Sequence, residues 1–369
     1  MIRASGDEPS IARRILVTLA ALIIFRLGSL IPLPGVDVAS LYPSSEPAYV
    51  NAISRLSIFA FGLSTFFFVV LCAEAIKLLF PGVLRWEAEN AANRDRISLA
   101  ISVVALILAA LQAWTIAIAL EDIGGLVPSP GAVFRTGVVA TEVGATAFLI
   151  WLCDQITRHG VGHGLWLLWA VPTLAGFLLH ADQALVLVRS GEIPQAAFVI
   201  GALWLLAVIL IAVLLAKARF GRSLLRSNAA DLAFPGSLIR SRMAFDIAPL
   251  LIATMLCDVL ASVTWGPPLP GHGCSWRIVA YIVALAGLIL SFYVLRGRAD
   301  LVLARQRGET PDSRAMLRQA CFTAGALALI SIVGKILFPL LPSAPLLLVV
   351  ILVAEDIVES VAARWPARV

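Results

Sequence analysis

Long apolar runs constrain this chain more than any other feature of its sequence. Stretches rich in Leu, Ile, Val, Ala and Phe recur from residue 14 to residue 362, separated by Pro, Gly and clusters of charge. A helix needs roughly 20 mostly apolar residues to cross a hydrocarbon layer about 30 Å thick. With 60% hydrophobic and 14% charged residues among 369, little of the chain remains for a soluble domain. The sequence therefore predicts an all-α, polytopic membrane protein.

The apolar runs predict about ten transmembrane helices. The first run follows Arg13 and Arg14 as in a secretory signal, but it lacks a small-residue cleavage pattern, so we interpret it as a retained first helix. The helices are expected near residues 14–33, 57–79, 97–120, 137–154, 164–181, 195–216, 244–264, 277–295, 319–341 and 344–362.

Basic residues predict the orientation, because short loops rich in Lys and Arg stay on the cytoplasmic side. Most of the 28 Lys and Arg fall in alternate loops when the N-terminus is placed inside. Both termini of a multi-pass protein of the cytoplasmic (inner) membrane are then cytoplasmic. The longest inner breaks, 217–243 and 296–318, are basic, and we expect them to be docking surfaces for a cytoplasmic partner.

Ten spans divide into two sets of five, in residues 1–186 and 187–369. An odd number of helices in each half makes the second half run in the opposite sense across the membrane. This is the arrangement of inverted repeats, which place a pathway between the halves. The sequence thus predicts two inverted five-helix halves around a central pore.

Motifs for catalysis or cofactor binding are missing from the sequence. It has no Ser, His and Asp arrangement, phosphate-binding glycine loop or paired-carboxylate site. His159 and His163 lack further metal ligands, and the basic residues are dispersed rather than gathered for nucleic acid. We therefore expect no enzymatic activity, cofactor, metal or nucleic-acid partner. The cysteines, which show no paired short spacing, are Cys72, Cys153, Cys257, Cys274 and Cys321.

Several motifs, in this order and spacing, resemble the SecY family of preprotein translocase channel subunits, in a divergent and shortened form. The longest combines a Gly-x-x-x-Phe-Leu-x-Trp-Leu helix, an acidic-Gln-Ile-Thr turn and a Gly-x-Gly-x-Gly helix opening. The motifs are RLGSLIPLPGVD (Arg26–Asp37), LQAWTIAIALE (Leu111–Glu121), GATAFLIWLCDQITRHGVGHGLWLL (Gly144–Leu168), FDIAPLLIATML (Phe245–Leu256) and LLLVVILVAEDIVES (Leu346–Ser360).

The resemblance implies an hourglass pore with a hydrophobic constriction, a plug after the first helix and a side opening between the second and seventh helices. Bulky apolar side chains in such a ring seal around a passing chain and close when the pore is empty. Carried over motif by motif, the resemblance places the pore ring at Phe67, Leu71, Trp169, Thr173, Leu251 and Val349. It places Glu74, Gln112 and Thr254 at the lateral gate.

The resemblance also implies partners: SecE-like and SecG-like small membrane subunits, an unfolded polypeptide substrate, the lipid bilayer, and a SecA-like ATPase or ribosome. Two departures bear on them. Segment 37–52 lacks the plug's Asn, Ser, Gly, Gly stretch, so we expect a reduced plug, and 296–318 lacks the Ile-Pro-Gly-Ile-Arg-Pro-Gly run tied to motor docking. Docking then falls to the remaining arginines, Arg219, Arg222, Arg226, Arg240, Arg242, Arg305, Arg307 and Arg314.

Two other functions are open at this point. An ion-coupled transporter for a small solute would use a relay of charged groups at membrane depth, namely Glu74, Glu142, Asp258 and Lys335. Asp258 and Lys335 are candidates to pair with each other. A degenerate, non-conducting membrane scaffold is the second alternative. An apolar ring and basic inner loops favour the channel for unfolded polypeptides.

Overall fold

The fold is helical throughout the part of the chain that the structure describes. The computed structural model describes residues 11–37, 56–191, 244–265 and 275–306, with scattered positions in 196–210 and 318–329. The only pairing of extended backbone there is an isolated antiparallel bridge between Pro32 and Ser57. The predicted all-α class is confirmed. The helices are α1 (Ile11–Gly28), α3 (Gly62–Leu79), α4 (Pro81–Glu89), α5 (Ala91–Glu121), α6 (Ala132–His159), α7 (Gly164–Arg189), α9 (Ala244–Trp265) and α10 (Ser275–Gln306).

Each predicted span within the described ranges corresponds to one helix, but several boundaries were wrong. α1 ends at Gly28, because the chain turns before the prolines of 29–37. α3 begins at Gly62, after turns at 56–61. α10 continues to Gln306, so the start of the predicted loop 296–318 is helical. The predicted span 344–362 and most of 195–216 and 319–341 lie outside the described residues.

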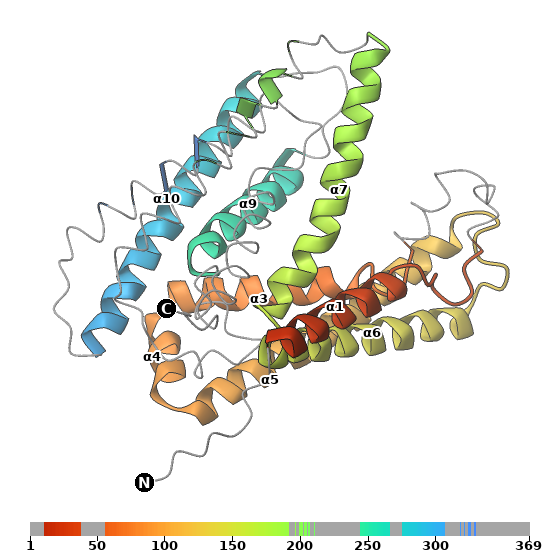
Figure 1. Ribbon diagram of the computed structural model, residues 1–369, viewed down its shortest axis with the longest axis horizontal. Coiled ribbons are helices and arrows are strands. Elements are labelled where there is room, and N and C mark those ends of the chain that lie inside the picture. Colours follow the sequence, from red (N-terminus) through yellow and green to blue (C-terminus); the bar gives the residue numbers. More distant parts are fainter. Residues whose placement is uncertain are drawn as a thin grey trace.

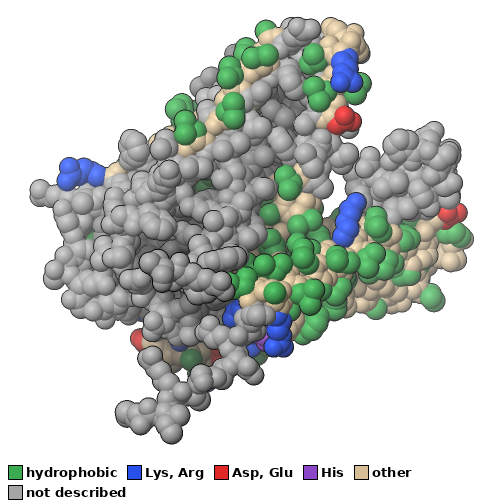
Figure 2. Space-filling model, in the orientation of Figure 1, with side chains coloured by type: hydrophobic (Ala, Val, Ile, Leu, Met, Phe, Trp, Pro, Cys, Tyr) green, Lys and Arg blue, Asp and Glu red, His purple; other side chains and the backbone are tan. Residues whose placement is uncertain are grey.

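Four helices in the described part are long and apolar enough to cross a membrane. They are α3, α5, α6 and the portion Ala280–Ala299 of α10. On α1, Leu16 is 67% exposed and Ile23 59% exposed, and on α5, Leu99 is 65% exposed. Figure 2 shows exposed apolar side chains gathered over the region of α1 and α6 in Figure 1. Such a surface suits contact with lipid, as expected of a multi-pass membrane protein.

The long helices α5 and α6 form an antiparallel pair beneath the rest of the molecule in Figure 1, and α3 packs against both. Alanines recur on α5 at every fourth position: Ala105, Ala109, Ala113 and Ala117 are all buried. Residues four apart share one face of a helix, and small side chains there let two helices approach closely. The pair α9 and α10 packs side by side and reaches the lower group through α3 and α4.

The turn between α6 and α7 explains the Gly-x-Gly-x-Gly motif. A Cβ on Gly160 would lie 2.6 Å from Thr18 Oγ1 of α1, and one on Gly164 would overlap the carbonyl oxygen of Cys153. Gly162 has φ 77°, in the left-handed region that favours glycine. The Thr18 hydroxyl accepts a hydrogen bond from Val161 N at 2.9 Å. This turn is therefore packed tightly between three helices.

Burial also decides the state of the histidine inside this turn. His163 is 8% exposed, and burial lowers the pKa of its imidazole to about 4. The folded chain thus holds His163 neutral at neutral pH. His159, one turn earlier at the end of α6, is exposed.

Candidate pore constriction and gate

The predicted ring positions on three helices lie within one buried cluster. Phe67 and Leu71 of α3 are each 2% exposed, Leu251 of α9 is 4% exposed, and Trp169 of α7 packs against the cluster. The ring of Phe67 stacks on Trp169, with centroids 4.2 Å apart and planes 7° from parallel. Trp166 meets the same phenyl ring edge-on, with centroids 5.5 Å apart. The structure therefore brings an aromatic stack and two aliphatic side chains together.

The remaining ring predictions differ in what surrounds them. Thr173 follows Trp169 by one turn, is half-buried, and donates its hydroxyl to the Trp169 carbonyl at 2.8 Å. That bond satisfies the hydroxyl within the helix, so its polarity is partly masked. Val349 lies outside the described residues.

The predicted gate residues do not form one cluster, because Gln112 and Glu74 lie near different parts of α3. Gln112 of α5 accepts a hydrogen bond from the Thr65 hydroxyl of α3, at 2.5 Å between Oε1 and Oγ1. Glu74 lies nine residues further along α3, which is about 14 Å along a helix axis. Thr254 of α9 is buried and donates to the Leu251 carbonyl at 3.0 Å. The structure thus adds Thr65 to the set, as the hydrogen-bond partner of Gln112.

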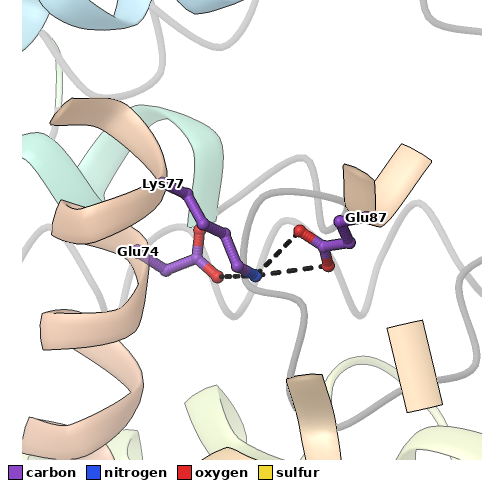
Figure 3. A network of polar contacts seen from close by, with 3 residues as sticks. All are labelled: Glu74, Lys77 and Glu87. Carbon is purple, nitrogen blue, oxygen red and sulfur yellow. Dashed lines mark hydrogen bonds and ion pairs between the residues drawn. The ribbon is translucent and has the colours of Figure 1, made fainter. Parts of the chain in front are cut away.

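Glu74 belongs instead to a buried charged triad, formed with Lys77 and Glu87 (Figure 3). Lys77 Nζ lies 2.9 Å from Glu74 Oε1, 3.0 Å from Glu87 Oε2 and 3.2 Å from Glu87 Oε1. The side chains of Lys77 and Glu74 are 1% and 0% exposed, and that of Glu87 is 10% exposed. Glu74 and Lys77 are three residues apart on one face of α3, and Glu87 comes from α4.

Lys77 is buried rather than exposed to solvent. Its ammonium is enclosed between two carboxylates at the end of α3. The spacing of Glu74 and Lys77 was a usable signal, since residues three apart meet on a helix. The role of Glu87 had no such signal, because α4 was not predicted.

Two of the four charged groups of the predicted ion relay have local side-chain partners. Glu74 binds Lys77, and Asp258 accepts a hydrogen bond from the Tyr281 hydroxyl at 2.5 Å. Glu142 of α6 is 2% exposed, and Thr146 donates a hydrogen bond to its backbone carbonyl at 2.7 Å. The carboxylate oxygen Oε1 of Glu142 is buried without a hydrogen-bond partner among the described residues. Lys335, the predicted partner of Asp258, lies outside the described residues. These contacts lend the relay no support.

The predicted docking arginines lie almost entirely beyond the described ranges. Arg305 is in the last turn of α10. In the residues that were described, no group of three or more His, Cys, Asp or Glu side chains could hold a metal ion. The positions outside the described residues are Arg219, Arg222, Arg226, Arg240, Arg242, Arg307 and Arg314.

Comparison with known sequences identifies the relatives of this chain. The family model described as SecY matches residues 57–224. The protein translocase subunit SecY of Buchnera aphidicola subsp. Acyrthosiphon kondoi is 30% identical over 219 residues, which are 56% of this chain and 62% of that protein. The chain is related to SecY. The SecY of Escherichia coli strain K12 is also 30% identical over 219 residues, 56% of this chain and 49% of its own length. This SecY relative thus matches between 49% and 62% of the length of these two curated proteins.

Solved structures show that the likeness in fold extends along the chain. "The structure of a protein conducting channel" matches with a TM-score of 0.57 at 12% identity, covering 100% of this chain and 97% of that one. "Sec61 in the Canine ribosome-channel complex from the endoplasmic reticulum" matches with a TM-score of 0.59 at 11% identity, with the same coverage. The SecY relative therefore has the fold of these polytopic helical channels.

Proposed function

We propose that this chain is the central channel subunit of a preprotein translocase, which passes unfolded polypeptides across the membrane or sideways into it. The observation that carries the proposal is the channel fold, which covers 100% of this chain, together with the SecY match over residues 57–224. A passive channel needs no catalytic group, so we propose that the protein is not an enzyme.

The closed constriction in this proposal is formed by the predicted ring. Phe67 stacked on Trp169, with Leu71 and Leu251 in the same cluster, supports this role, since bulky apolar groups exclude water and ions when they meet. Thr173 and Val349 complete the proposed ring. Such a surface also has no preference among polypeptide sequences, which suits a channel for many substrates.

The lateral gate is proposed between α3 and α9, which pack together in the structure. Gln112 and Thr254 are the proposed gate residues, and the Thr65 to Gln112 hydrogen bond joins α3 to α5. Glu74, the third predicted gate residue, lies near the end of α3.

The proposed setting is the cytoplasmic (inner) membrane, with both termini cytoplasmic and SecE-like and SecG-like subunits bound. The basic stretches 217–243 and 296–318 are the proposed contact for a SecA-like ATPase or ribosome, which would supply the driving force. The division into inverted halves, 1–186 and 187–369, is part of the same proposal.

The test is replacement of a bacterium's own SecY. The host protein is depleted, this chain is expressed, and export of a secreted reporter is followed with co-purification of small membrane subunits. Rescue of export is the expected result. Stable expression without export, in cells where the small subunits still co-purify, would contradict the general channel function.

A second assay isolates the constriction. The purified chain in liposomes is expected to be sealed to a small anionic dye, whereas the double variant Phe67→Ala, Trp169→Ala is expected to leak. Phe68→Ala is the matched control, because Phe68 neighbours Phe67 on α3 but is 39% exposed. Equal dye release from the double variant and from the control would refute the proposed ring.

A further inference from the structure

A nearly fully buried set of ion pairs joins the end of α3 to α4. Lys77 lies between Glu74 of its own helix and Glu87 of α4, with Nζ to oxygen distances of 2.9 and 3.0 Å (Figure 3). Ions removed from water lose their hydration, so each carboxylate depends on the Lys77 ammonium to remain charged there, and the ammonium depends on the carboxylates. Losing the contact with Glu87 would leave α4 without its charged bond to α3.

Glu74 of the triad lies on the same face of α3 as the proposed constriction. Phe67, Leu71, Glu74 and Leu78 are spaced by four, three and four residues and all are buried. This spacing places them in one stripe along a helix. Phe67 and Lys77 are separated by about 15 Å of continuous helix. A rotation or shift of α3 at Lys77 therefore moves the Phe67 ring on Trp169.

The short helix α4 can pass such a movement on. It packs against α3, α5 and α10, and Asn93 of α5 donates a hydrogen bond to the Trp86 carbonyl at 2.8 Å. Its other face is open, with Arg85 exposed and Trp86 40% exposed. Thus α4 touches the gate helix on one side and is accessible from outside the protein on the other.

We propose that Lys77 is a positioning residue for the constriction, which holds α3 in the closed position by bridging Glu74 and Glu87, so that displacement of α4 releases the ring. This inference rests on the proposed channel function. A purely structural triad would instead stabilise the fold and leave the seal unchanged. The two differ in the permeability of protein that remains folded.

The experiment measures dye release from liposomes that contain the purified full-length chain. Glu87→Gln keeps the shape of the side chain and removes only the charge on α4, so we expect a several-fold rise in permeability at temperatures well below unfolding. The exchange Lys77→Glu with Glu87→Lys restores two acids and one base, and it is expected to return permeability to that of the unchanged chain. Glu89→Gln, at an exposed position of α4, is the matched control and should remain sealed.

Folding is followed in the same samples by size-exclusion chromatography and thermal unfolding. A Glu87→Gln protein that unfolds earlier but stays sealed would overturn the inference, as would an exchange variant that leaks like the single variant. The Phe67→Ala, Trp169→Ala protein separates the two proposals. If it leaks while Glu87→Gln does not, the positioning role fails alone, and if it too stays sealed, the proposed constriction fails with it.

Discussion

Near the two ends of the α5 and α6 pair, the molecule holds ion pairs of the same kind in different surroundings. At the α4 end, Lys77 is 1% exposed between two carboxylates. At the end that carries the α5–α6 loop, Arg135 donates to Glu121 Oε2 at 2.6 and 2.9 Å, but the arginine is 34% exposed. Glu121 Oε1 also accepts from Gly131 N at 2.8 Å, so this pair closes the loop.

The comparison shows that burial, rather than distance, decides how much a protein depends on a charge pair. The two clusters have similar distances between nitrogen and oxygen. Water can take over the hydrogen bonds of Arg135 when its partner is removed, whereas the buried ions at the α4 end have no such replacement. The same contrast applies to the glycines, which are tightly enclosed at the α6–α7 turn and open near the start of α6.

The largest effect is expected for Lys77→Met. It leaves two buried carboxylates without their cation, which typically costs about 3–5 kcal/mol. The thermal unfolding temperature of the purified chain in detergent should fall strongly. Adding Glu74→Gln and Glu87→Gln to the same protein should recover much of the loss, because no buried charge then remains. A Lys77→Met protein as stable as the unchanged chain would mean that water reaches the site.

The second effect is a dependence of stability on pH at the α6–α7 turn. His163 stays neutral in the folded chain down to about pH 4, whereas the unfolded chain takes up its proton below about 6.5. The contribution of His163 to the free energy of unfolding is therefore fully present above pH 6.5 and decreases as the pH drops to 4. The total loss from this group is roughly 3 kcal/mol at most. His163→Gln should flatten unfolding temperatures measured across this window, and His159→Gln, at an exposed position, should not.

The third effect compares glycines at the two ends of α6. Gly164→Ala places a methyl group on the Cys153 carbonyl, and such overpacking costs about 1–3 kcal/mol. Gly137→Ala meets nothing within 4 Å and should stabilise the helix by up to about 1 kcal/mol. Unfolding temperatures that shift in the same direction for both variants would show that the turn is looser than described.

The smallest effect is expected for Arg135→Gln. It removes the contact with Glu121 and the approach of the guanidinium to the Trp114 ring, whose centroid lies 6.0 Å away. Because Arg135 is partly in water, the fall in unfolding temperature should be well below that of Lys77→Met and should shrink further as salt is added. A loss equal to that of Lys77→Met would remove the distinction between the two ends.

Sequence patterns predicted the helices better than the contacts between them. The apolar runs at 164–181 and 244–264 begin at the first residues of α7 and α9, because a Gly-rich turn and a polar stretch precede them. The run at 57–79 was extended too far at its start, since Phe59 and Phe61 are apolar but lie in turns. Hydropathy measures side chains and does not register where the backbone stops being helical.

For the candidate site, the resemblance supplied residues, and the structure supplied their partners. Phe67 and Trp169 were assigned to one ring from separate motifs, and the structure stacks them. Glu74 was grouped with Gln112, but its contacts are with Lys77, and Gln112 bonds to Thr65. Motif matching compares positions one at a time, so it does not show which polar side chain meets which.

The sequence by itself determined that this chain is a multi-helix membrane protein and predicted its likeness to SecY. Solvation by lipid is a local requirement, met by each run of roughly 20 apolar residues independently of the others. Only the tertiary structure decided that α4 folds back to bring Glu87 to Lys77 and that α7 brings Trp169 to Phe67. These contacts join residues on different helices, and they depend on the angles at which helices leave their turns, which side-chain composition does not specify.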